Sequence, residues 1–196
     1  LEGGTLASDE RMSSVGRPNP LVRVEIMDDH NRILPSGETG EICVRGDLIM
    51  KGYYKAPEKT AETIIDGWLH TGDVGHIDAG GYLHLTDRKK DLIITGGFNV
   101  YPKEIEEVID ALPGVIESAV IGLPHPDFGE AVVAVVQPSG SFDAEAVREE
   151  MRRFLAAFKV PKRIIVLDEL PRNTMGKIQK KLLRERFAGL FSAKVL

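Results

Sequence analysis

The chain has 196 residues, of which 42% are hydrophobic and 28% are charged, and its formal net charge is −5 at pH 7. This length and composition suit one ordinary domain or two small ones, each with its own hydrophobic core. The acidic balance offers no general attraction to nucleic acid, and no apolar run approaches the roughly 18 residues of a membrane span. We therefore expect a soluble, cytoplasmic protein that binds no nucleic acid and has no membrane span.

The first part of the chain alternates apolar and polar residues in short stretches. These stretches are VRVEIMD, GEICVRG and GYLHLTD, and the sequences PSGETG, DG and DAGG separate them. Alternation with period 2, bounded by glycine, proline and aspartate, is typical of short antiparallel strands. Residues 1–87 are therefore predicted to form a β-rich unit. The single cysteine, Cys43, lies in one alternating run and is predicted to be a buried, inert thiol.

From residue 88 onward, helical and strand patterns follow one another. DLIIT predicts a strand, and PKEIEEVIDAL predicts a helix because its apolar residues recur at helical spacing after Pro102. IESAVIG, EAVVAVVQ and KRIIVLD predict three further strands. Between the last two we expect a helix capped by Asp143, with Val147, Met151, Phe154, Leu155 and Phe158 turned inward. Residues 88–196 should thus form a small mixed sheet flanked by helices, and the whole chain is predicted to be α+β.

A glycine-lysine pair stands near the C-terminus, in PRNTMGKIQKK. It does not fit the nucleotide phosphate loop, because Ile178 occupies the place where that motif needs a hydroxyl beside the lysine. In the helix expected to follow, apolar residues on one side leave the cations on a solvated face. The apolar residues are Ile178, Leu182 and Phe187, and the cations are Lys180, Lys181, Arg184 and Arg186. Lys177 precedes this helix, so a solvated face does not explain it.

Three other stretches allow a functional or a structural interpretation. Asp73 lies in a Thr-Gly-Asp turn between predicted strands, where its carboxylate could bond its own backbone or accept hydrogen bonds from both hydroxyls of a ribose. The charged run from Asp87 to Asp91 is typical of a solvated linker, and Gly96-Gly97 is typical of a turn. His125 lacks a paired nucleophile or a metal-spaced partner, which favours a structural or surface role.

The order of these pieces resembles a known superfamily. SGETGEICVRGDLIMKGYY, GWLHTGDVG, DRKKDLIITGGFNVYPKEIE and LPRNTMGKIQKKLLRE follow one another as in the C-terminal third of acyl-adenylate-forming enzymes. That superfamily includes acyl-CoA synthetases, adenylation domains of peptide synthetases, and beetle luciferases. The resemblance covers nearly the whole chain from Val15 onward, and GGFNVYPKEIE is similar to the bacterial acyl-CoA ligases.

The resemblance implies an activity with two steps. Such enzymes convert a carboxylic acid and Mg-ATP into an acyl-adenylate and pyrophosphate, and coenzyme A then displaces AMP. A large N-terminal domain holds the phosphate loop, the acyl pocket and most of the Mg²⁺ contacts, while a small C-terminal domain moves between two poses. Residues 1–87 would then end the large domain, and residues 88–196 would be the mobile one. A chain without the rest of the large domain is expected to be inactive alone and to hold no metal site.

The resemblance also implies roles for five residues. Asp73 matches the carboxylate that binds the ATP or AMP ribose, and Arg88 matches a cation that contacts the same ribose. Lys90 matches the hinge, where one backbone must change its dihedral angles. Gly97 matches the glycine beside the pantetheine channel of coenzyme A, where a side chain would obstruct the thiol. Lys177 matches the catalytic lysine of adenylation, whose charge neutralises the carboxylate and the α-phosphate as they approach.

Two alternatives to a carboxylate–CoA ligase remain open at this stage. An adenylation domain would pass its adenylate to a phosphopantetheine on a carrier protein. A binding module would use the same fold without catalysis. The resemblance favours a fatty or medium-chain acid through DRKKDLIITGGFNVYP, although the residues of the acyl pocket lie outside this chain.

Overall fold

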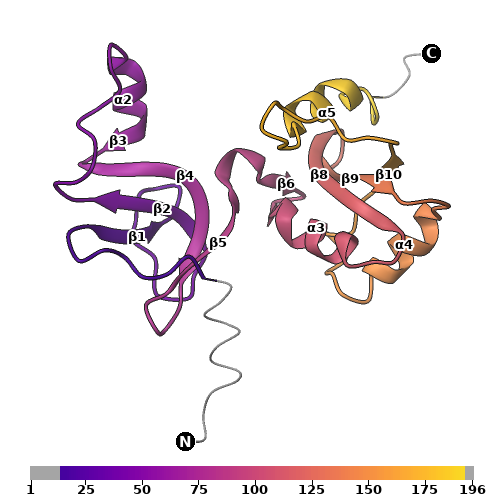
Figure 1. Cartoon of the computed structure of the whole chain (residues 1–196), viewed down its shortest axis with the longest axis horizontal. Helices are drawn as coiled ribbons and strands as arrows, with labels where there is room; N and C mark the ends of the chain where they lie inside the picture. Colours follow the sequence, from indigo (N-terminus) through magenta and orange to yellow (C-terminus); the bar gives the residue numbers. More distant parts are fainter. Residues whose placement is uncertain (1–13, 193–196) are drawn as a thin grey trace, which may run out of the picture. The chain divides into compact units, whose positions relative to one another are not determined.

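The computed structural model describes residues 14–192, which fall into two compact units shown in Figure 1. The first unit is Leu1–Lys90 and the second is Asp91–Leu196. The sequence pattern predicts this boundary between residues 87 and 88. Antiparallel sheets and helices occur together in the chain, which confirms the α+β class. Among residues 14–192, no helix is long and apolar enough to cross a lipid bilayer.

The first unit is built on an antiparallel sheet. Its elements are β1 (Arg23–Met27), β2 (Gly40–Arg45), α2 (Pro57–Thr63), β3 (Ile64–Ile65), β4 (Trp68–Ile77) and β5 (Leu83–Arg88). The strands lie in the order β1-β2-β4-β3, and β5 pairs with β4. The three alternating stretches of the sequence form β1, β2 and β5, as predicted. The long strand β4 carries WLHTGDVGHI and connects the sheet to the candidate site.

Cys43 lies in the small core of this unit with Met27 and Trp68. Its side chain is fully buried, which confirms the predicted burial. Burial, together with the negative charge of Glu41, raises the pKa of the Cys43 thiol to about 12. The thiol therefore keeps its proton at neutral pH and is a poor nucleophile.

The second unit is a mixed sheet with helices on both faces. Its elements are β6 (Ile93–Thr95), β7 (Phe98–Val100), α3 (Pro102–Asp110), β8 (Val115–His125), β9 (Gly129–Pro138), α4 (Ala144–Met151), β10 (Arg163–Val166) and α5 (Lys180–Phe187). The order is β10-β9-β6-β7, and β8 pairs with β9. The pair β9–β10 is parallel. Helix α4 follows β9 and precedes β10 in the sequence, and it provides the crossover connection that a parallel pair needs.

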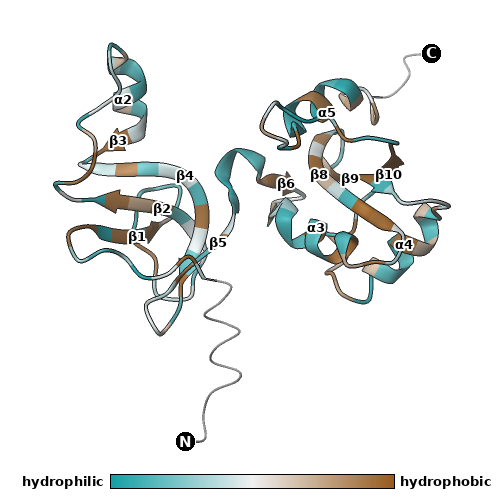
Figure 2. Cartoon of the chain, viewed as in Figure 1, coloured by the Kyte–Doolittle hydropathy of each residue, from teal (hydrophilic) through white to brown (hydrophobic). Residues whose placement is uncertain are grey.

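Strand β9 is buried on both sides, which accounts for its continuous apolar run in Figure 2. Alternate residues of β9 face two separate apolar clusters. Val132 and Val136 pack with residues of α3 and α4, such as Ile109 and Met151. Val133 and Val135 pack with Leu183 of α5. The sheet thereby places α3 and α5 on opposite faces.

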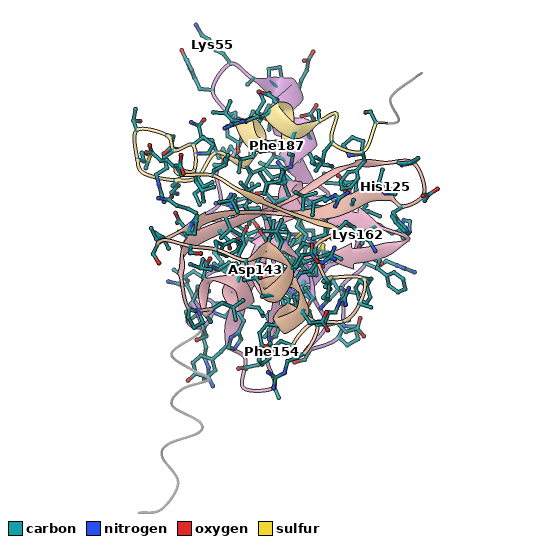
Figure 3. The ribbon with its side chains drawn as sticks, turned by 90° about the vertical axis from the view of Figure 1, so that its right-hand side faces the viewer. Lys55, His125, Asp143, Phe154, Lys162 and Phe187 are labelled. Carbon is teal, nitrogen blue, oxygen red and sulfur yellow. The ribbon has the colours of Figure 1, made fainter. Side chains whose placement is uncertain are left out.

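Two helix predictions need correction. Asp143 caps α4 as predicted, since its Oδ1 accepts hydrogen bonds from the amides of Glu145 and Ala146, but the helix ends at Met151. The amide of Phe154 bonds the Met151 carbonyl, so the chain tightens into turns. Phe154, labelled in Figure 3, is 64% exposed and does not face inward.

The second correction concerns α5. Leu183 is fully buried, whereas Leu182, the residue expected to face inward, is 42% exposed. Ile178 and Phe187 are partly buried against the same cluster. Helix α5 starts only at Lys180, so Ile178 does not share its helical phase, and a pattern counted from Ile178 selects the wrong leucine.

The raised pKa of Cys43 predicts a specific pH dependence of stability. The folded thiol keeps its proton up to about pH 12, whereas the unfolded thiol ionises near its ordinary pKa of 9.0. The folded state binds more protons in this window, so the free energy of unfolding falls as the pH rises through it. Between about pH 8 and 10.5, the native chain should lose about 1 to 2 kcal/mol more stability than Cys43→Ala. Urea denaturation of both proteins at the two pH values measures this, and identical losses would contradict the shift.

Candidate functional site

Two charged side chains meet where β5 ends beside the middle of β4. Asp73 and Arg88 are direct partners in the antiparallel register, and Arg88 Nε forms an ion pair with Asp73 Oδ1 at 2.7 Å. Their side chains keep 31% and 59% of their surface exposed, so a ligand can reach both groups. These are the two residues to which the resemblance assigns contacts with one ribose.

Asp73 lies inside a strand, not in the turn between strands that the sequence analysis expected. The register of β4 against β2 shifts here, so that residues 71–73 oppose a single residue of β2. Gly72 adopts a φ of +73°, a conformation that favours glycine. The Thr71 hydroxyl donates to the Ile42 carbonyl and accepts from the Asp73 amide. Such a bulge redirects the side chains that follow it, and it presents Asp73 toward Arg88.

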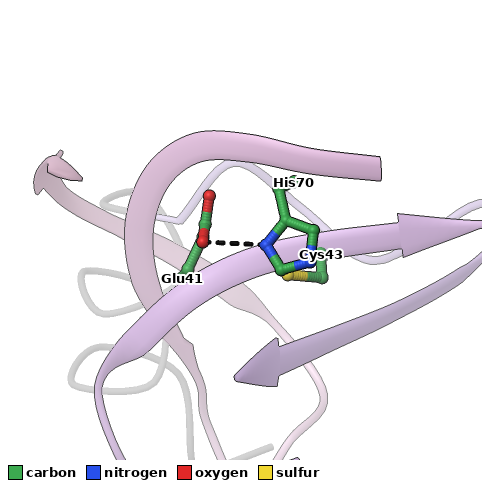
Figure 4. Close-up of side chains that lie close together, drawn as sticks. All are labelled: Glu41, Cys43 and His70. Carbon is green, nitrogen blue, oxygen red and sulfur yellow. Dashed lines mark hydrogen bonds and ion pairs between the residues drawn. The ribbon is translucent and has the colours of Figure 1, made fainter. Parts of the chain in front are cut away.

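A buried carboxylate lies next to the bulge, as Figure 4 shows. Glu41 of β2 is 7% exposed, and its Oε1 accepts a hydrogen bond from the Gly72 amide at 3.0 Å. Its Oε2 lies 2.9 Å from His70 Nδ1 and 3.1 Å from Lys89 Nζ. Burial opposes ionisation, but the hydrogen bonds from His70 and Lys89 outweigh it and hold the pKa of Glu41 below its ordinary value. Glu41 is not predicted from the sequence, where its only local signal is its place two residues before Cys43.

The same region brings three possible metal ligands together. Donor atoms of Glu41, Cys43 and His70 lie within 4.8 Å of one another, and Cys43 Sγ is 3.5 Å from His70 Nδ1. This donor set would suit zinc, but a metal would compete with the Lys89 ammonium for the same carboxylate. Cys43 would also have to lose a proton that burial stabilises. We therefore interpret the three side chains as a hydrogen-bonded network.

The charged run from Asp87 to Asp91 begins inside β5 and is not the predicted solvated linker. Its last three residues form η1, the 3-10 helix Lys89–Asp91. Lys89 Nζ also binds Asp29 at 3.0 Å. Asp91, whose side chain is 13% exposed, forms an ion pair with Arg184 at 2.6 Å. Lys90 is exposed and is the last residue of the first unit.

In the second unit, Gly97 lies in the tight turn between β6 and β7. Gly96 and Gly97 have φ angles of +56° and +84°, as a two-residue hairpin turn requires. A Cβ atom built on Gly97 would meet nothing within 4 Å. The next residue, Phe98, is 54% exposed and stacks on Phe158 at 4.5 Å between ring centroids. The tip of this hairpin is therefore open on its outer side.

Lys177 lies in a loop that hydrogen bonds hold in one shape. Asn173 Oδ1 accepts from the amides of Met175 and Lys177, each at 3.0 Å. The Asn173 amide bonds the Lys177 carbonyl, and the Gly176 amide bonds the Asn173 carbonyl. Gly176 has a φ of +79°, which glycine adopts without strain. The Lys177 side chain is exposed at the end of this loop.

Comparison with known proteins agrees with the order of these motifs. The family model of the AMP-binding enzyme matches residues 3–54, and that of the AMP-binding enzyme C-terminal domain matches residues 104–177. The chain belongs to the AMP-binding enzyme family. Lys177 is the last residue of the second match, whereas Asp73, Arg88 and Gly97 lie between the two matches.

Several AMP-binding enzymes are similar along most of the chain. The medium/long-chain-fatty-acid–CoA ligase of Mycobacterium tuberculosis is 42% identical over 91% of this chain and 33% of that protein. The fatty acid–[acyl-carrier-protein] ligase ScoC of Streptomyces coeruleorubidus is 43% identical over 100% of this chain and 37% of that protein. ATP-bound MatB from Rhodopseudomonas palustris is 49% identical, with a TM-score of 0.87 over 92% of this chain and 37% of that one. The chain thus spans about a third of the length of the curated relatives.

In this member of the AMP-binding family, Lys180 and Arg184 are not on the solvated face that the sequence predicted. Lys180 Nζ binds Glu106 Oε1 of α3 at 2.7 Å, and the two side chains are 17% and 10% exposed. The same oxygen accepts a hydrogen bond from the Val120 amide of β8 at 2.7 Å. The solvated face holds for Lys181, which is 86% exposed, and for Arg186, which is exposed. Helix α5 is therefore fastened at its first residue, close to the Lys177 loop.

His125 has a packing role at the end of β8. Its side chain is 16% exposed, and its ring lies 4.7 Å from that of Phe128 and 5.0 Å from that of Phe191. Its Nδ1 accepts a hydrogen bond from the Asp127 amide at 3.2 Å. These contacts make His125 part of an aromatic cluster, and Figure 3 labels it at the edge of the sheet.

The two lysines at the start of α5 provide a matched comparison. Lys180→Ala leaves the Glu106 carboxylate buried without its cation, so we expect a loss of about 2 to 4 kcal/mol in the free energy of unfolding of the second unit. Lys181→Ala removes a side chain that is exposed and 3.8 Å from Glu185, so the loss should stay below about 0.5 kcal/mol. Urea denaturation of both variants measures this difference. Equal losses would mean that the Lys180–Glu106 pair is not an anchor.

Proposed function

We propose that this chain is the C-terminal part of an AMP-forming acid–thiol ligase. In the first step, the carboxylate of the substrate attacks the α-phosphorus of ATP and pyrophosphate leaves. In the second step, the thiol of coenzyme A loses its proton and attacks the acyl carbonyl, and AMP leaves. The observation that carries this proposal is the exposed Asp73–Arg88 pair in an AMP-binding family chain that also presents Lys177 on an ordered loop.

The Asp73–Arg88 pair would bind the ribose of ATP and of the adenylate. A single carboxylate can accept hydrogen bonds from two vicinal hydroxyls, and the ion pair of Arg88 Nε with Oδ1 restricts the orientation of that carboxylate. The bulge at residues 71–73 sets the direction of Asp73. The pair therefore offers an acceptor and a cation at one accessible place.

Lys177 would supply charge in the adenylation step. Its ammonium approaches both anions, the carboxylate and the α-phosphate, and stabilises the transition state more than the bound substrates. The Asn173 turn and the Lys180–Glu106 pair hold the backbone on either side of it. Lys177 therefore needs to order little more than its own side chain, which lowers the entropic cost of placing the charge.

Gly97 and Lys90 would serve the thioester step. Gly97 leaves its hairpin tip open, so that pantetheine can pass, and Lys90 lies at the division of the two units, where a rotation would begin. Mg²⁺ would arrive with ATP. The acidic residue of the proposed nucleotide contacts, Asp73, is bound to Arg88 and is a poor ligand for a second cation. We assign Mg²⁺ mainly to the large domain.

The acyl acceptor and the acid follow from the relatives by analogy. A free coenzyme A acceptor is supported by the name of the mycobacterial relative, and a carrier protein by the name of ScoC. Both names specify fatty acids, which supports a fatty or medium-chain substrate. Incubating the full-length polypeptide with ATP, a fatty acid and either acceptor separates the two functions. The 196-residue chain alone should form no thioester, and neither reaction would occur in a binding module without catalysis.

The role of Lys177 is tested by measuring each half-reaction in the full-length polypeptide. Lys177→Ala should slow pyrophosphate release about a hundred- to a thousandfold, yet convert a synthetic acyl-adenylate and coenzyme A into thioester at a near-normal rate. Lys181→Ala is the matched control, because its side chain is similarly free of burial. Lys180→Ala is unsuitable, since it breaks the pair with Glu106. Normal adenylation by Lys177→Ala, or an equal loss in both steps, would exclude this role.

The role of Gly97 can be separated from backbone strain. Gly97→Leu should slow the thioester step at least about tenfold more than the adenylation step, because a leucine would fill the channel. Gly114→Leu is the control, since Gly114 has the same φ of +84° and an equally open surrounding. It should carry the same strain without the selective loss. If both variants lose the two steps in the same proportion, Gly97 does not line the path of the thiol.

A further inference from the structure

We propose that Glu41 is a positioning residue for the nucleotide site, because its buried carboxylate holds the residue before Asp73 and the residue after Arg88 at once. Glu41 Oε1 binds the Gly72 amide, and Oε2 binds Lys89 Nζ. The inference rests on the proposed function, in which Asp73 and Arg88 bind the ribose.

The geometry joins three segments that are distant in sequence. Glu41 belongs to β2, Gly72 to the bulge of β4, and Lys89 to η1, which follows β5 directly. The Asp73–Arg88 ion pair joins β4 and β5 at the two residues next to those that Glu41 binds. Moving either partner of the pair therefore affects the bonds to Glu41, because Glu41 holds the Gly72 amide next to Asp73 and the Lys89 side chain next to Arg88.

The position requires a charge and not only a shape. Besides His70, the partners of Glu41 are the Gly72 amide and the Lys89 ammonium, and both can act only as hydrogen-bond donors. A glutamine of the same size would place an amide N–H against one of these donors. Burial opposes the charged carboxylate, yet the pKa of Glu41 stays below its ordinary value. Lys89 likewise donates hydrogen bonds to the carboxylates of Asp29 and Glu41, and these outweigh burial and raise the pKa of Lys89.

The anchor, which is Glu41 with its bonds to Gly72 and Lys89, also affects Lys90, the residue where rotation is proposed. Lys89 is bound to Glu41 and Asp29 of the first unit, whereas the next residue, Lys90, is exposed and ends that unit. A backbone change at Lys90 would then start from a fixed neighbour. Glu41 thus keeps the ribose pair in place while the chain beyond Lys90 changes direction.

Steady-state kinetics of the full-length polypeptide test this role. Glu41→Gln should raise the KM for ATP about tenfold, because a hydrogen bond to a charged group is lost. It should leave the KM for the acid within about twofold. Glu25→Gln is the matched control, because Glu25 lies on the neighbouring strand and its ion pair is with Arg23. An unchanged KM for ATP, a similar rise in both KM values, or the same effect in Glu25→Gln would overturn the proposal.

Lys89→Met provides a second variant at a side chain that is 41% exposed and tests the role of the Glu41–Lys89 pair even if Glu41→Gln folds poorly. It should raise the KM for ATP but not the KM for the acid. In the double variant, the rise in the KM for ATP should be much less than the product of the two single rises. A product of independent effects would overturn the coupling. Cys43→Ala should leave the KM for ATP within about twofold. If Cys43→Ala instead raises the KM for ATP as much as Glu41→Gln does, and chelators raise the KM of the native protein, the three side chains are a metal site and not a hydrogen-bonded network.

Hydrogen exchange on the 196-residue chain separates this inference from the proposed function. In Glu41→Gln the Gly72 amide loses its charged acceptor, so its exchange should quicken at least about tenfold, whereas the amides of β9 should be unchanged. If the native polypeptide forms no acyl-adenylate but this change occurs, the proposed function fails and the anchor stands. If adenylate forms and the Gly72 amide is unaffected, the anchor fails alone.

Discussion

Both units depend on a buried glutamate that is neutralised by a lysine. Glu41 and Glu106 are 7% and 8% exposed, and each accepts a backbone amide as well as an ammonium. A carboxylate loses several kcal/mol of hydration when it is buried, so it stays in place only if donors surround it. Each glutamate therefore determines where two other segments must lie.

The consequences extend to the residues proposed for chemistry. The lysine bound to Glu41 follows Arg88 directly, and the lysine bound to Glu106 comes three residues after Lys177. In both units the ion pair of a buried glutamate thus lies beside an exposed functional side chain. Such an arrangement restricts the backbone while it leaves the reactive group free to meet a ligand, which is what precise placement requires.

The sheet of the second unit explains how Glu106 reaches its partners. Strand β8 pairs with β9 along one edge, and the Val120 amide of β8 is left for the Glu106 carboxylate. Helix α3 packs on one face of the sheet and α5 on the other, so Glu106 and Lys180 meet beside this strand. The ion pair covers an edge amide that would otherwise lack a partner.

The sequence by itself determined the features that repeat or act locally: the strands β1, β2 and β5, the Asp143 cap, the burial of Cys43 and the order of the family motifs. It also identified Asp73 and Arg88, which the structure joins. Only the tertiary structure decided that Glu41 anchors their neighbours, that Lys180 is buried while Lys181 is solvated, and that α4 ends at Met151. The physical reason is that periodicity and capping depend on residues a few positions apart, whereas the partners of Glu41 are 29 to 48 positions away. In the sequence, a charged residue that pairs with a distant partner cannot be distinguished from one that is solvated.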